Sequence, residues 1–171
     1  MIIWNALHLC LHGELLIKRG DVIGLRLLRN ALGELREAQF RMRYSAYLGT
    51  LAHCLGANGQ ITEASDAIEE ALDWSKRNVE RWCMAELLRV KGELFRLEGS
   101  AAAAESHYMQ ALEWARRQGA LSWELRAATG LSQLWHQHGK TAEAAKLLSS
   151  VYSRLTQGFE PSDLRAARAL I

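Results

Sequence analysis

Apolar residues recur along this chain at every third or fourth position, in long stretches separated by short polar turns. This spacing puts the apolar side chains on one face of an α-helix, where they can meet a neighbouring helix. The pattern predicts helices over residues 2–19, 22–39, 42–57, 61–77, 81–98, 101–118, 121–138 and 141–156. A short last helix is expected at 161–170, because Pro161 suits the first position of a helix. The chain is therefore predicted to be all-α.

Glycines in the turns after alternate helices recur at a fixed period. Gly20, Gly59, Gly99 and Gly139 follow one another at intervals of 39, 40 and 40 residues. Small residues stand seven positions before them and large apolar residues four positions before them: Gly13, Ala52, Gly92 and Ser132, then Leu16, Leu55, Phe95 and Trp135. Residues suited to cap or begin the next helix follow each glycine: Asp21, Thr62, Ser100 and Thr141. This periodicity predicts repeated units of helix A, a tight turn at glycine, and helix B.

The tripeptide Gly139-Lys140-Thr141 matches the end of a phosphate-binding P-loop. A P-loop also needs a glycine five residues before the second glycine, in a loop that follows a strand. Position 134 is Leu134, and residues 124–138 have helical periodicity. The repeat period accounts for Gly139 by itself, so we expect a turn between helices and no nucleotide site.

Composition and charge exclude several classes of protein. One proline in 171 residues agrees with long helices and short loops. The net charge of +2 is spread along the chain, so direct binding of nucleic acid is not expected. The apolar N-terminus is interrupted by His8, His12 and Glu14 well before the roughly 20 residues that span a membrane, and no membrane partner is expected. Three widely spaced cysteines indicate no disulfide framework and favour a cytoplasmic protein.

The third unit resembles a tetratricopeptide repeat. It carries the small and large residues of that signature at matching positions: Gly92, Phe95, Gly99, Ala104, Tyr108 and Ala111. The period exceeds the usual 34 residues, so each helix is expected to be longer by about one turn. The prediction is a right-handed superhelical array in a single domain over 1–171. Its units are about 2–40, 41–79, 80–119 and 120–157, followed by a capping helix at about 161–170.

A narrower resemblance covers "RWCMAELLRVKGELFRLEG" (81–99), "ALEWARRQGALSWELRAATGLSQLWHQHGK" (111–140) and "VYSRLTQGFEPSDLRAARAL" (151–170). These segments look like the C-terminal repeat region of large bacterial signalling ATPases. In that family an adenylate-cyclase-like or winged-helix DNA-binding domain precedes an ATPase module. The resemblance implies a regulatory, partner-binding role in signalling or transcription. It implies no catalysis here, because the chain has no ATPase or cyclase motif.

The inner face of each helix A gives the candidate binding residues. Counting back from the glycines by thirteen, ten, six and three positions selects Glu86, Arg89, Glu93 and Arg96, then Arg126, Thr129, Gln133 and His136. In the second unit His53 takes the place of Glu93. Ion pairing within one helix would contribute only about 0.2–0.5 kcal/mol per pair. A mixed-charge groove for a peptide or partner helix is the functional alternative, and both interpretations remain open at this point.

The first predicted helix is apolar around most of its circumference, although a terminal repeat should have a polar outer face. The residues that make this edge include Ile2, Ile3, Trp4, Leu7 and Leu11. In an isolated chain the edge is predicted to drive homodimerisation. The last helix instead has the narrow apolar strip expected of a cap, formed by Leu164, Ala167 and Leu170.

Other chemically suggestive residues have simpler explanations. His8 and His12 lie on one helix face, but a metal site needs further ligands and none is apparent. Trp74, Trp114 and Trp135 are expected to pack between repeats. The thiols are expected to be buried and unreactive, and the adjacent acids Glu69 and Glu70 are expected on the solvated surface.

The sequence thus predicts a non-catalytic scaffold with no cofactor and no metal, which binds a protein or peptide in the helix A groove. The partner could also be an attached ATPase module. The alternative is a small-ligand sensor with its pocket near Arg89, Arg96 and His136. An enzyme is not expected, because no catalytic constellation is present.

Overall fold

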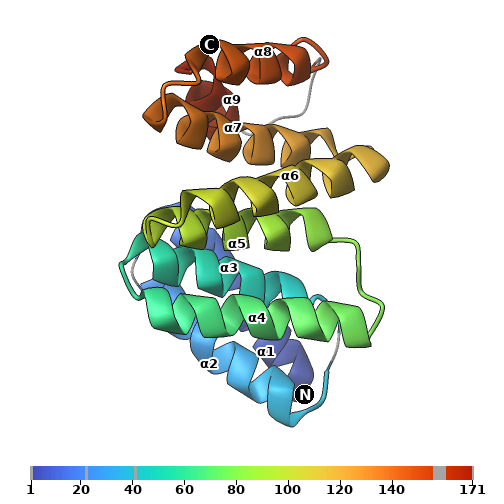
Figure 1. Ribbon diagram of the computed structural model, residues 1–171. Helices are drawn as coiled ribbons and strands as arrows, with labels where there is room; N and C mark the ends of the chain where they lie inside the picture. Colours follow the sequence, from blue (N-terminus) through green and yellow to red (C-terminus); the bar gives the residue numbers. More distant parts are fainter. Residues whose placement is uncertain (1, 22, 41, 156–160, 171) are drawn as a thin grey trace. The chain divides into compact units, whose positions relative to one another are not determined.

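The computed structural model describes residues 2–21, 23–40, 42–155 and 161–170, and all regular structure in these ranges is helical (Figure 1). The helices are α1 (Ile2–Lys18), α2 (Ile23–Glu37), α3 (Tyr44–Ala57), α4 (Ile61–Arg77), α5 (Met84–Leu97), α6 (Ala101–Arg117), α7 (Leu121–Gln137), α8 (Thr141–Tyr152) and α9 (Pro161–Arg168). These bounds differ from the predicted ones by only a few residues. The prediction of an all-α chain built from four helix pairs and a final short helix is confirmed.

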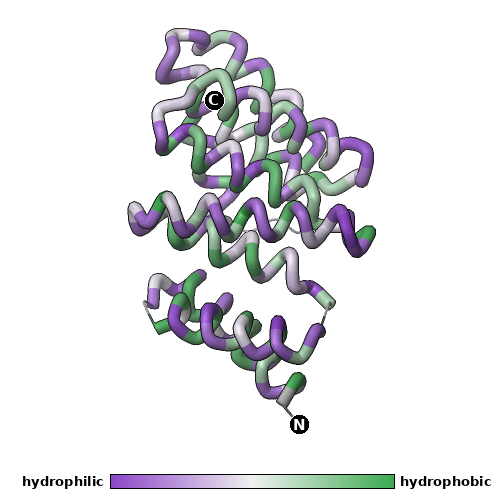
Figure 2. The backbone as a smooth tube through the Cα atoms, turned by 60° about the horizontal axis from the view of Figure 1, so that its bottom comes forward, coloured by the Kyte–Doolittle hydropathy of each residue, from purple (hydrophilic) through white to green (hydrophobic). Residues whose placement is uncertain are grey.

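Each odd-numbered helix from α1 to α7 packs against the helix that follows it, which gives the expected pairs of helix A and helix B. The pairs form because apolar positions recur along each helix and are buried where two helices meet. Figure 2 shows this recurrence as apolar positions that alternate with polar ones along the helices. None of the helices in the described ranges is long and apolar enough to cross a membrane.

The A helices end with the same hydrogen-bonded motif. Gly20, Gly59, Gly99 and Gly139 have φ values of 75–79°. The residue after each glycine donates its backbone N–H to a carbonyl five residues back, as Lys140 does to Trp135 at 2.9 Å. Left-handed φ favours glycine, and this bond closes the helix end. Gly139 and Lys140 therefore form a turn between α7 and α8, as predicted, and Thr141 begins α8. The element that precedes the turn is a helix and not a strand.

The starts of the B helices agree only in part with the predicted caps. The Asp21 carboxylate accepts a hydrogen bond from the Ile23 N–H at 2.9 Å, which is a cap interaction. Ser100 stands at the N-cap position of α6 but its side chain makes no cap bond. Thr62 and Thr141 lie in the first turns of their helices, after Gln60 and Lys140.

The chain divides into two compact units, Met1–Cys83 and Met84–Ile171. The first, called here the N-terminal unit, contains α1 to α4, and the second, the C-terminal unit, contains α5 to α9. Each unit has its own core. The largest fully buried side chains are Leu28, Leu35, Tyr44, Tyr47, Leu55 and Ile68 in the N-terminal unit, and Leu87, Tyr108, Leu112, Leu125, Leu131 and Leu148 in the C-terminal unit.

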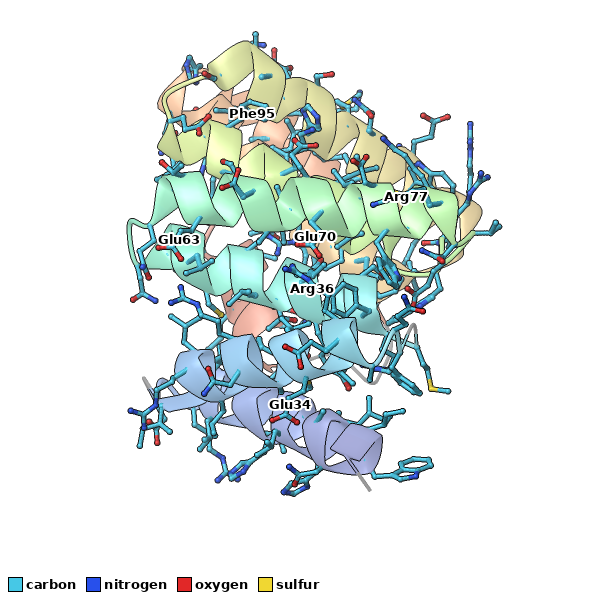
Figure 3. The ribbon with its side chains drawn as sticks, turned by 90° about the horizontal axis from the view of Figure 1, so that it is seen from below. Glu34, Arg36, Glu63, Glu70, Arg77 and Phe95 are labelled. Atoms are coloured by element: carbon cyan, nitrogen blue, oxygen red, sulfur yellow. The ribbon has the colours of Figure 1, made fainter. Side chains whose placement is uncertain are left out.

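Two ion pairs join the B helices of the N-terminal unit. Arg29 pairs with Glu63 at 2.7 Å. Arg36 pairs with Glu70 at 2.5 Å, and Figure 3 shows both side chains of this second pair. The Tyr44 hydroxyl accepts a hydrogen bond from Arg36 and donates one to Glu70, both at 3.0 Å. Glu69 is exposed as expected, whereas Glu70 is half-buried and its carboxylate is bound by a buried tyrosine and by an arginine from α2.

Candidate functional site

The predicted groove residues of α5 form an ordered ladder of ion pairs. Arg89 donates two hydrogen bonds of 2.8 Å to Glu86, and Arg96 donates bonds of 3.2 and 2.5 Å to Glu93. Each pair spans three residues on one helix face, so the interpretation of pairing within one helix is correct for these four side chains. The side chains are also largely covered, with exposed fractions of 11–23%. Removing one partner of such a covered pair leaves the other charge uncompensated, which costs more than it would on an open surface.

Tyr108 of α6 joins this ladder from the neighbouring helix. Its hydroxyl donates a hydrogen bond of 2.6 Å to Glu93. Its ring lies against the backbone at Gly92 of α5 and Gly130 of α7, where an added Cβ would come within 3.0 and 2.6 Å of the ring. Sequence reasoning placed Tyr108 in the repeat signature but missed its role in the site. The signal available in the sequence was that Tyr108 and Gly92 belong to the same signature of large and small residues.

The network fixes the charge of its members. Burial acts to raise the pKa of Glu93, but hydrogen bonds from Arg96 and Tyr108 and the nearby guanidiniums hold it below the ordinary value. Burial acts to lower the pKa of Arg89, and the Glu86 carboxylate raises it above the ordinary value. Burial, and then the charge of Glu93, raise the pKa of the Tyr108 hydroxyl. Near neutral pH the ladder therefore carries both signs of charge side by side.

Two α7 residues of the predicted groove contact the C-terminal segment of the chain, and one of them also contacts α5. Arg126 lies 3.6 Å from Glu86 and donates a hydrogen bond of 2.6 Å to Asp163 of α9. A ring nitrogen of His136 lies 3.3 Å from the Leu170 carbonyl oxygen. The chain's own last helix thus covers part of the surface that was predicted to receive a partner.

The remaining residues of the predicted groove do not join this network. Thr129 is buried and its hydroxyl donates to the Leu125 carbonyl at 2.8 Å, while Gln133 is half-buried. His53 is exposed on α3 and belongs to the N-terminal unit. The structure therefore brings Glu86, Arg89, Glu93, Arg96 and Arg126 into one network. Sequence reasoning missed Asp163, because 37 residues separate it from Arg126.

Comparison with known proteins finds a likeness among solved structures. No family model matches the chain, and no curated protein matches it. Among solved structures, BtubC (BKLC) from P. vanneervenii has a TM-score of 0.71 and 19% identity, and the match covers 99% of this chain and 84% of that one. A Podosopora anserina putative kinesin light chain with nearly identical TPR-like repeats has a TM-score of 0.66 and 18% identity, covering 95% and 85%. A variant of that putative kinesin light chain, in a separate crystal structure, has a TM-score of 0.70 and 17% identity, covering 99% and 88%.

The chain has a TPR-like helical repeat fold. In the terms of that fold, α1, α3, α5 and α7 are the A helices, and the ladder on α5 lies on a helix A face. The sequence identities are below 20%, so the likeness extends to the fold alone.

The apolar edge of the first TPR-like helix is partly exposed. The side chains of Trp4 and Leu11 are 77% and 48% exposed, and Ile3 and Leu7 are half-buried. The side chain of Ile2 lies outside the described residues. Dimerisation through this edge stays a prediction.

No group of three potential metal-binding side chains occurs among the described residues. His8 and His12 lie with their ring centroids 5.8 Å apart. Cys10, Cys54 and Cys83 are buried and free, as expected. Burial raises the pKa of Cys10 to about 12 and the pKa values of the other two to about 11, so their thiols are protonated near neutral pH.

The tryptophans were expected to pack between repeats. Trp135 contacts the preceding repeat, whereas Trp74 packs within its own repeat. Trp74 lies against the Tyr44 ring with centroids 4.6 Å apart, although its buried indole nitrogen has no hydrogen-bond partner in the described part of the chain. Trp135 donates a hydrogen bond of 2.8 Å to Glu105, and Lys140 lies over its ring. Lys140 also lies 3.6 Å from Glu105, so the lysine of the Gly-Lys-Thr sequence has a structural role at this turn.

Proposed function

We propose that this chain is a non-catalytic scaffold that binds a protein or peptide partner at the helix A face of its C-terminal unit. The proposal is based on the ladder of Glu86, Arg89, Glu93 and Arg96. Its members are held by one another and by Tyr108, so binding would cost little side-chain entropy. Arg96 and Glu93 each keep 21% of the side chain exposed, which leaves both charges within reach of a partner.

The biological setting is the second part of the proposal. The resemblance of 81–99, 111–140 and 151–170 to the repeat tails of bacterial signalling ATPases supports a cytoplasmic role in signalling or transcriptional regulation. The partner would then be a separate protein, a peptide or an attached ATPase module. The three cysteines are buried with pKa values raised to about 11 to 12, so they are protonated near neutral pH and are poor nucleophiles.

A matched pair of arginine substitutions tests the proposal. Arg96→Gln removes a charge from the helix A face, whereas Arg117→Gln removes one from an exposed pair with Glu113 on α6. Both arginines belong to ion pairs within a single helix, but Arg96 is 21% exposed and Arg117 is 66% exposed. We expect the wild-type chain and Arg117→Gln to capture the same partner from a lysate of the source cells. Arg96→Gln should capture about tenfold less of that partner.

Quantitative mass spectrometry of the captured proteins provides the measurement, and circular dichroism verifies that both variants are folded. Equal capture by the wild type and Arg96→Gln would contradict the proposal. A small metabolite that raises the melting temperature of the wild type and Arg117→Gln, but not of Arg96→Gln, would instead favour the small-ligand sensor.

A further inference from the structure

Two loops of the N-terminal unit present large apolar side chains to solvent. The α2–α3 loop exposes 64% of Met42, and the loop after α4 exposes 73% of Val79 and 40% of Trp82. Both loops join a helix B to the next helix A, and Figure 1 shows them at the same ends of their helices. We call Met42, Val79 and Trp82 the loop patch. Apolar residues gathered in this way on a surface commonly mark a contact with another molecule.

The loop patch is held in place by Glu80. Its carboxylate accepts hydrogen bonds from the Arg43 N–H and the Ser45 hydroxyl, both at 2.9 Å, and from the Trp82 indole at 3.1 Å. Its backbone carbonyl accepts a bond of 2.5 Å from the Ser75 hydroxyl. The two loops are therefore fastened to each other and to α4. An exposed apolar surface that is already ordered needs little rearrangement to bind.

Val79 has a backbone conformation that is unfavourable for its side chain. Its φ is 57°, in the left-handed region, and the equivalent repeat positions hold Gln39 and Gly119 with φ values of 51° and 63°. A β-branched residue there is strained by roughly 1–2 kcal/mol relative to glycine. The Val79 side chain is 73% exposed, so it buries too little surface within the unit to offset that cost. Strain of this kind is typical of positions with a role in binding.

The chemistry around the loop patch indicates what would bind there. Met42, Arg77, Asn78, Val79 and Glu80 line an open depression of about 490 Å³, large enough for a few side chains. The exposed residues Arg43, Arg77 and Arg81 belong to the same segments, and the Arg43 guanidinium lies over the Trp82 ring. The one carboxylate among these lining residues, that of Glu80, already accepts bonds through both oxygens. The surface thus combines an apolar centre with an excess of positive charge.

We propose that the loop patch is a second docking surface, which binds a short acidic segment of a partner protein. An aliphatic or aromatic side chain of that segment packs against Met42 and Val79, and its carboxylates pair with the guanidiniums. This surface belongs to the N-terminal unit, whereas the helix A face with the ladder belongs to the C-terminal unit.

The substitution Val79→Gly separates binding from folding, because it removes the apolar side chain and also relieves the backbone strain. Gln39→Gly is the matched control, since it relieves strain at the equivalent repeat position without removing an apolar group. Met109→Ser is a second control, because Met109 is 50% exposed on α6 of the other unit. The probe is a random-peptide display library selected on the wild-type chain, with counter-selection on Val79→Gly.

We expect enriched peptides that combine leucine, isoleucine or phenylalanine with aspartate or glutamate. In titrations, Val79→Gly and Arg77→Glu should each weaken binding about tenfold, while Gln39→Gly and Met109→Ser leave it unchanged. Val79→Gly and Gln39→Gly should also raise the melting temperature, which shows that the lost binding does not come from unfolding.

Three results would overturn the proposal. They are a selection that enriches no peptide, enriched peptides that are basic or uncharged, and peptides that bind Val79→Gly as tightly as the wild type. A wild-type dimer that Val79→Gly dissociates in sedimentation experiments would assign the loop patch to self-association and also overturn it.

Discussion

At the scale of single residues, the space around a glycine decides whether it can be replaced. Gly130 lies in the interior of α7, where an added Cβ would come within 2.6 Å of the Tyr108 ring. That ring is fully buried and its hydroxyl is bonded to Glu93, so it cannot easily move aside. Gly33 lies in the interior of α2 with open space around it. The two positions therefore share a secondary structure and differ in their surroundings.

Alanine at these two positions should have opposite effects on stability. Gly130→Ala should lower the free energy of unfolding by about 1–3 kcal/mol, because the methyl group overpacks the contact with Tyr108. Gly33→Ala should raise it by about 0.5–1 kcal/mol, because alanine favours the helix and meets no neighbour. Differential scanning calorimetry of both variants gives the comparison. A Gly130→Ala protein as stable as the wild type would contradict the assigned contact.

The sequence predicted some of these residues and not others, for identifiable physical reasons. Gly139 and Gly92 were recognised because they recur at the repeat period. Gly130 was missed because its neighbour, Tyr108, comes from another helix and no periodic pattern links the two. The left-handed Val79 was missed because a β-branched residue is the last type that a turn signal would suggest. The repeat period thus revealed the turns that all repeats share. Contacts that occur in only one repeat could be identified only from the structure.

At the scale of elements, α9 is another case in which the sequence predicted the helix but not its polar contacts. Its amphipathic pattern predicted a helix that packs by one face, and Ala167 is fully buried as that pattern implies. The polar contacts that hold it on α7, from Asp163 to Arg126 and from Leu170 to His136, join residues 37 and 34 positions apart. Hydrophobic periodicity indicates that a helix has a buried face, but it does not identify the polar partner of each side chain.

Loss of the Asp163 charge should loosen α9 without unfolding the rest of the C-terminal unit. Asp163→Asn removes the negative charge that pairs with Arg126. At this partly buried site the ion pair contributes about 1 kcal/mol to the stability of the docked helix. Amide hydrogen exchange in α9 should then become about fivefold faster, since local opening governs exchange.

Mass spectrometry of exchanged peptides measures this effect. Glu113→Gln is the control, because it neutralises an exposed acid paired with Arg117 on α6. Exchange in α9 that is the same in Asp163→Asn and the wild type would show that the ion pair does not hold the helix.

At the scale of the whole molecule, the repeat period predicted the fold well, because each repeat uses the same turn and the same pairing of helices. The period continues without a break from Val79 to Gly119 and so gives no sign of the division between the units at Cys83. The prediction of one domain over 1–171 stays a prediction. A consequence of the division is that all three cysteines belong to the N-terminal unit.

The native thiols should react slowly until that unit opens. With pKa values of about 11 to 12, raised by burial, the thiolate fraction at pH 8 is more than a hundredfold below that of an exposed cysteine. We expect an aromatic disulfide reagent to label the folded chain at least a hundredfold more slowly than the urea-unfolded chain. Three thiols that react as fast as glutathione in native buffer would contradict their burial.

The positions of the cysteines have a practical consequence for spectroscopy. Residues 84–171 contain no thiol, and the three native thiols are shielded. A single cysteine at an exposed place in the C-terminal unit, such as Gln118→Cys or Ser122→Cys, would react first with a maleimide dye. A fluorophore could therefore be attached to the C-terminal unit without replacing any native residue of the core, and partner binding could be followed by its emission.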